Sequence, residues 1–202
     1  GLGCSVKFLN DSSINIKSDE YNDVFNVKSF VNKVKTGKFD MGVSIEDNGE
    51  KMMLIDGKGR IVTEDMFIAL ISIILFKSVE GGTVIVPLSA SNVVEKLAQM
   101  NNGNVIRSKT SHQDIMGKLL SPEAKEEMLE QFTMYFDAVA SFSKILDFMA
   151  QGNYKLADLV DMIPEFYMSR KEVECPWDAK GKVIRKIIQE NDYDKIETVE
   201  GV

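Results

Sequence analysis

The pattern of apolar and polar positions is clearest in residues 39–63, where two turns separate three short apolar runs. Met41–Ile45 and Met52–Ile55 flank the polar loop Glu46–Lys51, and Asp56–Gly59 then leads into a third run. The Asn-Gly and Asp-Gly pairs supply the positive-φ positions that tight turns need. The stretch therefore predicts a hairpin followed by one more short strand.

Apolar spacing on both sides of this hairpin predicts further helices and strands. Residues 3–9 alternate and predict a strand, whereas residues 24–36 have helical spacing. An almost wholly apolar helix over 64–76 and a buried strand over 83–87 are expected next. The other predicted elements are a helix over 91–100, a strand over 105–108, helices over 111–120, 121–134, 136–149, 156–162 and 180–190, and a last strand over 196–199. Because strand, helix and strand follow one another between 83 and 108, those two strands should be parallel.

The order of these elements predicts an α/β fold in which a mixed sheet is layered with helices. The composition changes after Pro164, which predicts a partial α+β domain at the C-terminal end. We expect residues 1–38 to be the tail of a preceding α/β domain, 39–164 the main α/β domain, and 165–202 the truncated start of another. The chain begins at Gly1 and enters an expected strand almost at once, so we expect it to be part of a longer protein.

Composition and charge narrow the classes of function. A hydrophobic content of 44% with 27% charged residues is typical of a soluble globular protein. The net charge of −7 argues against a nucleic-acid partner, and the apolar run Met66–Leu75 is too short to span a membrane. Two cysteines without a metal motif predict a cytoplasmic protein. A small anionic ligand stays compatible with this composition, because a few local cations outweigh the overall charge.

The loop Glu46–Lys51 is the candidate metal site of the sequence. Glu46, Asp47 and Glu50 lie beside Asn48, and clustered oxygen ligands on a short loop suit a hard cation such as Mg²⁺. Acidic loops of this kind also occur as solvated turns without a bound ion. Both interpretations stay open at this point.

The order of these motifs resembles that of the α-D-phosphohexomutases, the phosphomannomutase and phosphoglucomutase family. Their third domain carries a metal loop of the form Asp-Gly-Asp-x-Asp-Arg between two strands, where this chain has Glu46–Lys51. Their later Arg-x-Lys-x-Gly-His segment is similar to Arg107–His112, and residues 169–182 resemble the junction into the fourth domain. The junction is most similar to versions fused to a mannose-1-phosphate guanylyltransferase-like nucleotidyltransferase.

The resemblance implies a domain of an isomerase that moves phosphate between two hydroxyls of a hexose, an intramolecular phosphotransferase. It implies Mg²⁺ at Glu46, Asn48 and Glu50, and sugar-phosphate contacts by Lys109 and His112. For these last two residues, a solvated charge and a polar residue at a helix start are the other interpretations. The phosphoserine donor of the family and its phosphate clamp belong to other domains, so other domains of the parent chain are expected partners.

The sequence departs from the family pattern at the positions that carry its chemistry. The three metal positions are Glu, Asn and Glu instead of three aspartates, which would reshape a compact Mg²⁺ site. Lys51 replaces the following arginine and loses its bidentate fork. No Gly-Glu-x-x-Gly-His sugar loop follows His112, and a helix is expected over 121–134 instead.

These departures predict degenerate metal and sugar loops and no bound cofactor in this stretch. We therefore expect a non-catalytic structural or regulatory module of a larger sugar-nucleotide enzyme. The alternative is a fragment of an active hexose-phosphate mutase with an altered Mg²⁺-binding loop, which by itself would be inactive.

Overall fold

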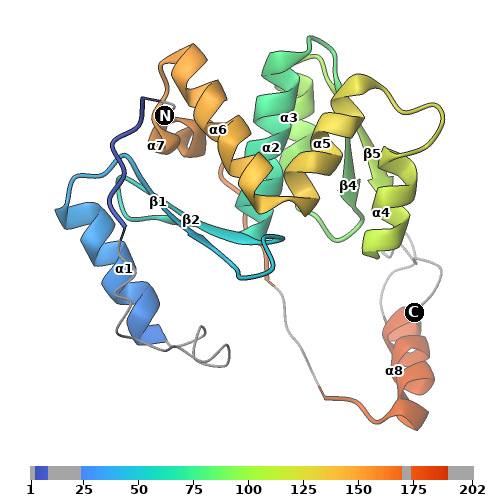
Figure 1. Cartoon of the computed structure of the whole chain (residues 1–202). Coiled ribbons are helices and arrows are strands. Elements are labelled where there is room, and N and C mark those ends of the chain that lie inside the picture. Colours follow the sequence, from blue (N-terminus) through green and yellow to red (C-terminus); the bar gives the residue numbers. More distant parts are fainter. Residues whose placement is uncertain (1–2, 9–23, 170–173, 191–202) are drawn as a thin grey trace.

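The protein is described here by a computed structural model that covers residues 3–8, 24–169 and 174–190 (Figure 1). The helices are α1 (Val24–Thr36), α2 (Glu64–Ser78), α3 (Val93–Met100), α4 (His112–Leu119), α5 (Glu126–Phe136), α6 (Ala138–Gly152), α7 (Leu156–Asp161) and α8 (Trp177–Glu190). The strands are β1 (Met41–Ile45), β2 (Met52–Asp56), β3 (Ile61–Val62), β4 (Thr83–Pro87) and β5 (Asn104–Ser108). The predicted α/β fold class is confirmed.

The strands of the described residues form two small sheets. In the first, β1 and β2 make the predicted antiparallel hairpin, with Met41 opposite Asp56 and Ile45 opposite Met52, and β3 pairs with β2. In the second, β4 and β5 lie parallel. The parallel pairing confirms the strand–helix–strand unit that the sequence predicted.

Helix α2 is the centre of the fold and lies between the two sheets (Figure 1). Thr63 caps its start, because the hydroxyl accepts a hydrogen bond from the backbone N–H of Met66 at 3.4 Å. Every residue from 68 to 76 is buried. The main core joins this helix to Leu54 of the antiparallel sheet and Val84 of the parallel sheet. A helix that is apolar on all sides is thus buried on all sides, as predicted.

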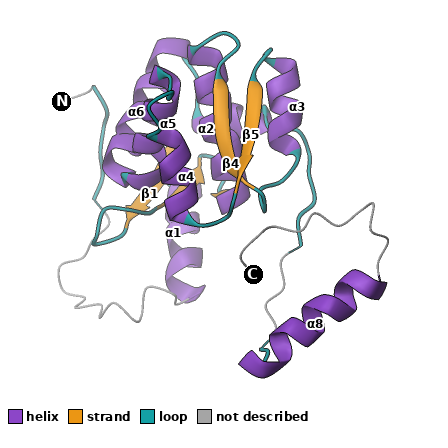
Figure 2. Cartoon of the chain, turned by 90° about the vertical axis from the view of Figure 1, so that its right-hand side faces the viewer, coloured by secondary structure: helices purple, strands orange, loops and turns teal. Residues whose placement is uncertain are grey.

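The two faces of the β4–β5 sheet are covered by different helices (Figure 2). Val84 and Val86 belong to the main core with α2 and α3, whereas Ile85 between them packs against residues of α4 and α5. Gln131 of α5 is fully buried and bonds to the backbone of Ile85 twice. The Ile85 N–H donates to its Oε1 at 2.9 Å, and its Nε2 donates to the Ile85 carbonyl at 2.5 Å. The glutamine side chain therefore satisfies β4 where a neighbouring strand would otherwise do so.

Helix α1 packs on the outer face of the β1–β2 hairpin. Val34 is 1% exposed, and a Cβ added at Gly42 would lie 2.4 Å from its Cγ2 atom. Gly42 therefore allows the helix to approach the sheet closely. Helix α8 stands apart from the folded body in both ribbon views (Figures 1 and 2), and its Trp177 is 85% exposed. The division of the chain into three parts stays a prediction.

Two predicted elements differ from the structure. Residues 3–8 contain no strand, and Val6 and Phe8 are exposed. Alternation alone does not make a strand without a partner to pair with. The predicted helix over 121–134 begins only at Glu126, because the Ala124 N–H donates to the Ser121 carbonyl at 2.8 Å and closes a turn. The predicted strand over 196–199 lies outside the described residues.

The Ser-Pro-Glu sequence explains the second difference. Proline fixes a φ that suits the first position of a helix, and the same φ suits the second position of a β-turn. The sequence therefore fits both structures equally well. In the fold this stretch connects α4 to α5 as a loop.

Candidate functional site

The loop between β1 and β2 is a tight hairpin turn closed by backbone hydrogen bonds. The Glu46 N–H donates to the Lys51 carbonyl and the Gly49 N–H donates to the Glu46 carbonyl, both at 2.9 Å. Gly49 has a φ of +71°, which favours glycine. The turn holds the Glu46, Asn48 and Glu50 side chains at the surface.

Two of the three candidate metal ligands bond to each other. Asn48 accepts a hydrogen bond from the Glu50 N–H through Oδ1, and its Nδ2 donates to Glu50 Oε2, both at 3.1 Å. The first of these bonds fixes which end of the amide faces the backbone, and the second turns its N–H₂ toward the carboxylate. Mg²⁺ needs near-octahedral oxygen ligands, whereas Asn48 turns its N–H₂ group toward Glu50 and its own oxygen toward the backbone. As arranged, these side chains do not fit a compact Mg²⁺ site.

Among residues 3–8, 24–169 and 174–190, no three His, Cys, Asp or Glu side chains lie together in a group that could hold a metal ion. The assignment of Glu46, Asn48 and Glu50 as metal ligands stays a prediction, which titration with Mg²⁺ tests.

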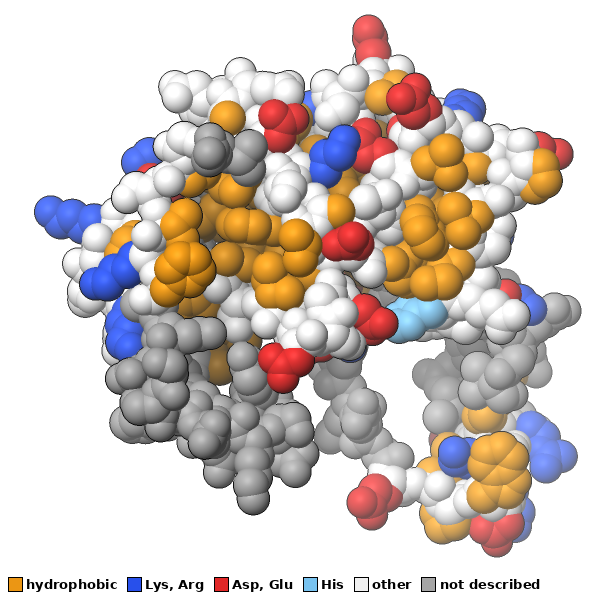
Figure 3. All heavy atoms as spheres, in the orientation of Figure 1, with side chains coloured by type: hydrophobic (Ala, Val, Ile, Leu, Met, Phe, Trp, Pro, Cys, Tyr) orange, Lys and Arg blue, Asp and Glu red, His pale blue; other side chains and the backbone are white. Residues whose placement is uncertain are grey.

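The other candidate residues lie after β5, Lys109 in the loop and His112 at the first position of α4. Lys109 and His112 are exposed, and Ser111 caps α4 by accepting a hydrogen bond from the Asp114 N–H at 3.1 Å. The predicted cap is therefore confirmed. The His112 ring meets the ring of Phe136 edge-on, with the centroids 5.8 Å apart at 83°. In Figure 3 the histidine lies at the lower edge of the folded body, below a patch of hydrophobic side chains.

Arg107 has a structural role. Its guanidinium donates to both carboxylate oxygens of Glu95 at 2.8 and 2.9 Å, and to the carbonyls of Leu88 and Ala90 at 3.0 and 2.8 Å. These bonds fasten β5 to the loop after β4 and to α3. The Arg107 guanidinium therefore stabilises the fold. Lys109 lies just after the end of β5.

The hairpin loop and the His112 segment meet the same part of the molecule. The Gly49 carbonyl accepts a hydrogen bond from the Ala138 N–H at 2.8 Å, and Ala138 is the first residue of α6. Phe136, which His112 contacts, is the last residue of α5. The structure therefore brings the two candidate stretches to one junction between helices.

A charged network that the sequence did not predict fastens the turn after β2 to α7. Asp56 is fully buried and accepts hydrogen bonds from the Lys58 and Arg60 N–H groups at 3.0 and 2.8 Å and from Arg60 Nε at 2.6 Å. Lys58 and Arg60 both reach Asp161, at 2.5 and 2.6 Å. The hydrogen bond from Lys58, and next that from Arg60, hold the pKa of Asp161 below its usual value. An aspartate that ends an apolar run and precedes glycine was the signal available in the sequence.

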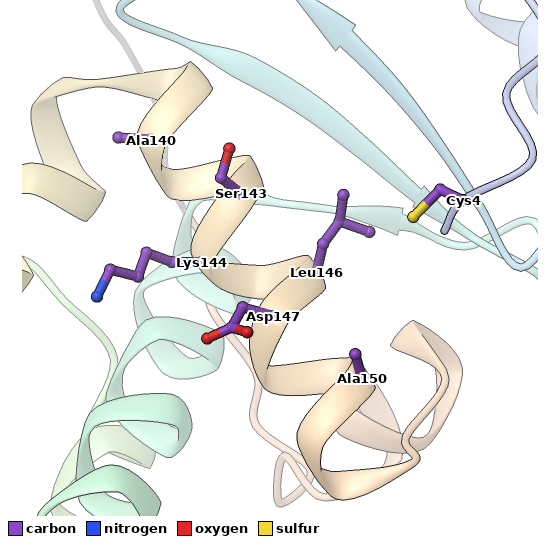
Figure 4. Close-up of a pocket in the computed structure, with 7 residues that line it drawn as sticks. All are labelled: Cys4, Ala140, Ser143, Lys144, Leu146, Asp147 and Ala150. Atoms are coloured by element: carbon purple, nitrogen blue, oxygen red, sulfur yellow. The ribbon is translucent and has the colours of Figure 1, made fainter. Parts of the chain in front are cut away.

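The structure also has a shallow hollow that no predicted site residue lines (Figure 4). It measures about 450 Å³ and lies along the outer side of α6, beside the N-terminal segment. Its lining residues are Cys4, Ala140, Ser143, Lys144, Leu146, Asp147 and Ala150. The candidate site is therefore an exposed surface of loops, separate from this hollow.

Comparison with known proteins shows what this domain is similar to. No family model matches the chain. The relatives and the solved structures to which the chain is similar are nevertheless of one kind, namely phosphoglucomutases, phosphomannomutases and phosphoglucosamine mutases.

Two of the relatives are mutases from Thermococcus and Methanococcus. A phosphoglucomutase/phosphomannomutase of Thermococcus kodakarensis is 26% identical over 212 residues, which cover 99% of this chain and 46% of the relative. A phosphoglucosamine mutase of Methanococcus aeolicus is 25% identical and covers 89% of this chain and 42% of the relative. The chain therefore spans about half the length of the curated relatives it matches.

Solved structures share the fold. A phosphoglucomutase/phosphomannomutase family protein from Burkholderia thailandensis superimposes with a TM-score of 0.59 at 16% identity, over 72% of this chain and 33% of that one. A phosphomannomutase-type protein from Thermus thermophilus gives a TM-score of 0.57 at 9% identity, over 69% of this chain and 34% of that one. At these identities the likeness concerns the fold alone.

Proposed function

We propose that this stretch is a phosphohexomutase-related sugar-phosphate domain that acts as a non-catalytic structural or regulatory module of a larger sugar-nucleotide enzyme. The observation that carries the proposal is the pairing of Asn48 with Glu50 inside the hairpin loop. When bound, Mg²⁺ would supply charge neutralisation for phosphoryl transfer. A loop whose amide and carboxylate bond to each other is poorly arranged to hold that ion.

The proposed ligand contacts are Lys109 and His112. They follow the carboxyl end of β5, and open α/β sheets bind ligands outside the carboxyl ends of their parallel strands. An ammonium group and an imidazole are both able to donate hydrogen bonds to a phosphate. The hairpin loop itself lacks the arginine of the family loop, since Lys51 replaces it and has no bidentate fork for a phosphate.

The loop between α4 and α5 lies where the family's sugar-binding loop is expected. Residues 121–125 form a loop rather than the expected helix, so a loop does follow α4. Its sequence is Ser-Pro-Glu-Ala-Lys, which does not match Gly-Glu-x-x-Gly-His. The missing Gly-Glu-x-x-Gly-His motif is therefore the support for a degenerate sugar loop, since the helix expected at these residues is absent.

A cytoplasmic location and fusion to a nucleotidyltransferase belong to the same proposal. In the described structure Cys4 and Cys175 form no disulfide. A search of the described residues for a helix long and apolar enough to cross a membrane found none. The fusion rests on the sequence of residues 169–182. Other domains of the parent chain are the proposed partners, without nucleic acid or membrane.

Enzyme assay of the longest natural protein that contains this sequence tests the proposal. We expect no conversion of glucose 1-phosphate or mannose 1-phosphate to the 6-phosphate in the presence of Mg²⁺, because the loop is poorly arranged for the metal. The Thermococcus relative, assayed in parallel, serves as the positive control. Turnover that disappears in Glu46→Gln would contradict the proposal and establish an active mutase with an altered metal loop.

A further inference from the structure

The junction between α5 and α6 is a single residue that both helices share. Asp137 ends α5 by donating its backbone N–H to the Thr133 carbonyl at 3.0 Å. It also caps α6, since its carboxylate accepts a hydrogen bond from the Ala140 N–H at 2.9 Å. With one extended residue bonded in both directions, the two helices have little freedom to move independently at this point.

Each candidate loop is attached to this junction on one side of Asp137. The hairpin loop is attached through the Gly49 carbonyl, which accepts the first N–H of α6 from Ala138. That N–H has no partner within the helix, so the loop completes the helix start. His112 is attached on the other side, through its edge-on contact with Phe136. The two attachment points are two residues apart in the chain.

Ala138 and Phe136, the two residues that contact the loops, are themselves packed against the rest of the domain. Ala138 is 3% exposed, and the Phe136 ring is also packed against Phe132 and Tyr135, with centroids 5.2 and 6.3 Å apart. The junction therefore cannot follow a movement of either loop without disturbing packed side chains. The junction is therefore a continuous packed connection between the two loops.

We infer that the Phe136–Ala138 junction couples the hairpin loop 46–51 to the 109–112 segment, and that Phe136 is a positioning residue for His112. A rearrangement of the loop shifts the start of α6, and the junction passes that shift to the His112 ring. The inference rests on the proposed function only in that the 109–112 segment carries the proposed ligand contacts, Lys109 and His112. The coupling itself belongs to the protein without a ligand.

The single histidine of the chain makes the coupling measurable. In protein labelled at histidine with ¹³C and ¹⁵N, the imidazole gives one set of signals that needs no assignment. Asn48→Ala removes both bonds to Glu50 and loosens the loop, so it is expected to shift the His112 signals at fixed pH. Asn32→Ala, at an exposed position on α1, is the matched control and should leave them unchanged.

Variants of Phe136 test whether the change in the His112 signals depends on the junction. In a Phe136→Leu background, which removes the aromatic ring, Asn48→Ala should no longer move the His112 signals. In a Phe136→Tyr background, which keeps the ring, the response should return. Circular dichroism of each variant verifies that the fold is retained, and Phe136→Tyr carries the test where the leucine variant does not fold.

Three results would overturn the inference: unchanged His112 signals in Asn48→Ala, an equal response with and without the Phe136 ring, and no response in Phe136→Tyr. All spectra are recorded without sugar phosphate or Mg²⁺. Failure of the coupling is therefore distinguishable from failure of the proposed function, which the mutase assay decides independently.

Discussion

Gln131→Ala is expected to lower the free energy of unfolding by about 2–5 kcal/mol. The substitution leaves the buried N–H and carbonyl of Ile85 without partners, and it opens a cavity where the side chain was fully buried. Domains of this size are stable by about 5–15 kcal/mol, so the loss is a large fraction of the total. Urea unfolding followed by circular dichroism measures it.

The choice of signal matters, because Trp177 is the only tryptophan and is 85% exposed on α8, apart from the body. Tryptophan fluorescence would therefore report poorly on the core. Gln113→Ala is the matched control, since Gln113 is exposed on α4 and its loss should change stability by at most about 0.5 kcal/mol. Equal stabilities for the two variants would show that the Gln131 bonds are not needed at the edge of β4.

Asp56→Ala is expected to cost about 2–4 kcal/mol, somewhat less than a fully buried ion pair because the Arg60 side chain is 38% exposed. The variant leaves the Arg60 guanidinium without its buried carboxylate and removes the acceptor for two backbone N–H groups of the turn. The same unfolding experiment measures the loss. Hydrogen exchange should additionally be faster at the Lys58 and Arg60 N–H groups, which lose their acceptor.

A graded series separates charge from hydrogen bonding at this position. Asp56→Asn keeps one acceptor for the backbone and loses the charge, so its stability should lie between those of the parent and Asp56→Ala. Asp47→Ala is the control, because Asp47 is an exposed aspartate of the hairpin loop. An Asp56→Ala variant as stable as Asp47→Ala would refute the role assigned to the network.

Local patterns in the sequence predicted much of the fold. Helix α2 was predicted from its capping threonine and its continuous apolar run, and the hairpin from its turn residues. Where one sequence suits two structures, prediction failed. Ser121-Pro122-Glu123 fits a helix start and a turn equally, and residues 3–8 alternate without becoming a strand.

Such local patterns do not predict contacts between residues that are far apart in the sequence. Gln131 bonds to Ile85 across 46 positions, and Arg60 bonds to Asp161 across 101. No periodicity marks either pair. At the candidate site the sequence located the hairpin loop and the His112 segment. It did not show that Asn48 and Glu50 bond to each other or that both stretches meet the α5–α6 junction.

Calorimetric titration with Mg²⁺ tests the central claim most directly, namely that the hairpin loop does not hold the family's metal. We expect no saturable binding to the natural sequence in the millimolar range, because the Asn48 amide turns its N–H₂ group toward the Glu50 carboxylate and its oxygen toward the Glu50 backbone N–H. A variant with Glu46→Asp, Asn48→Asp, Glu50→Asp and Lys51→Arg, which restores the three aspartates and the arginine of the family loop, should gain binding. A clear one-site isotherm for the natural sequence, lost in Glu46→Gln, would contradict the account.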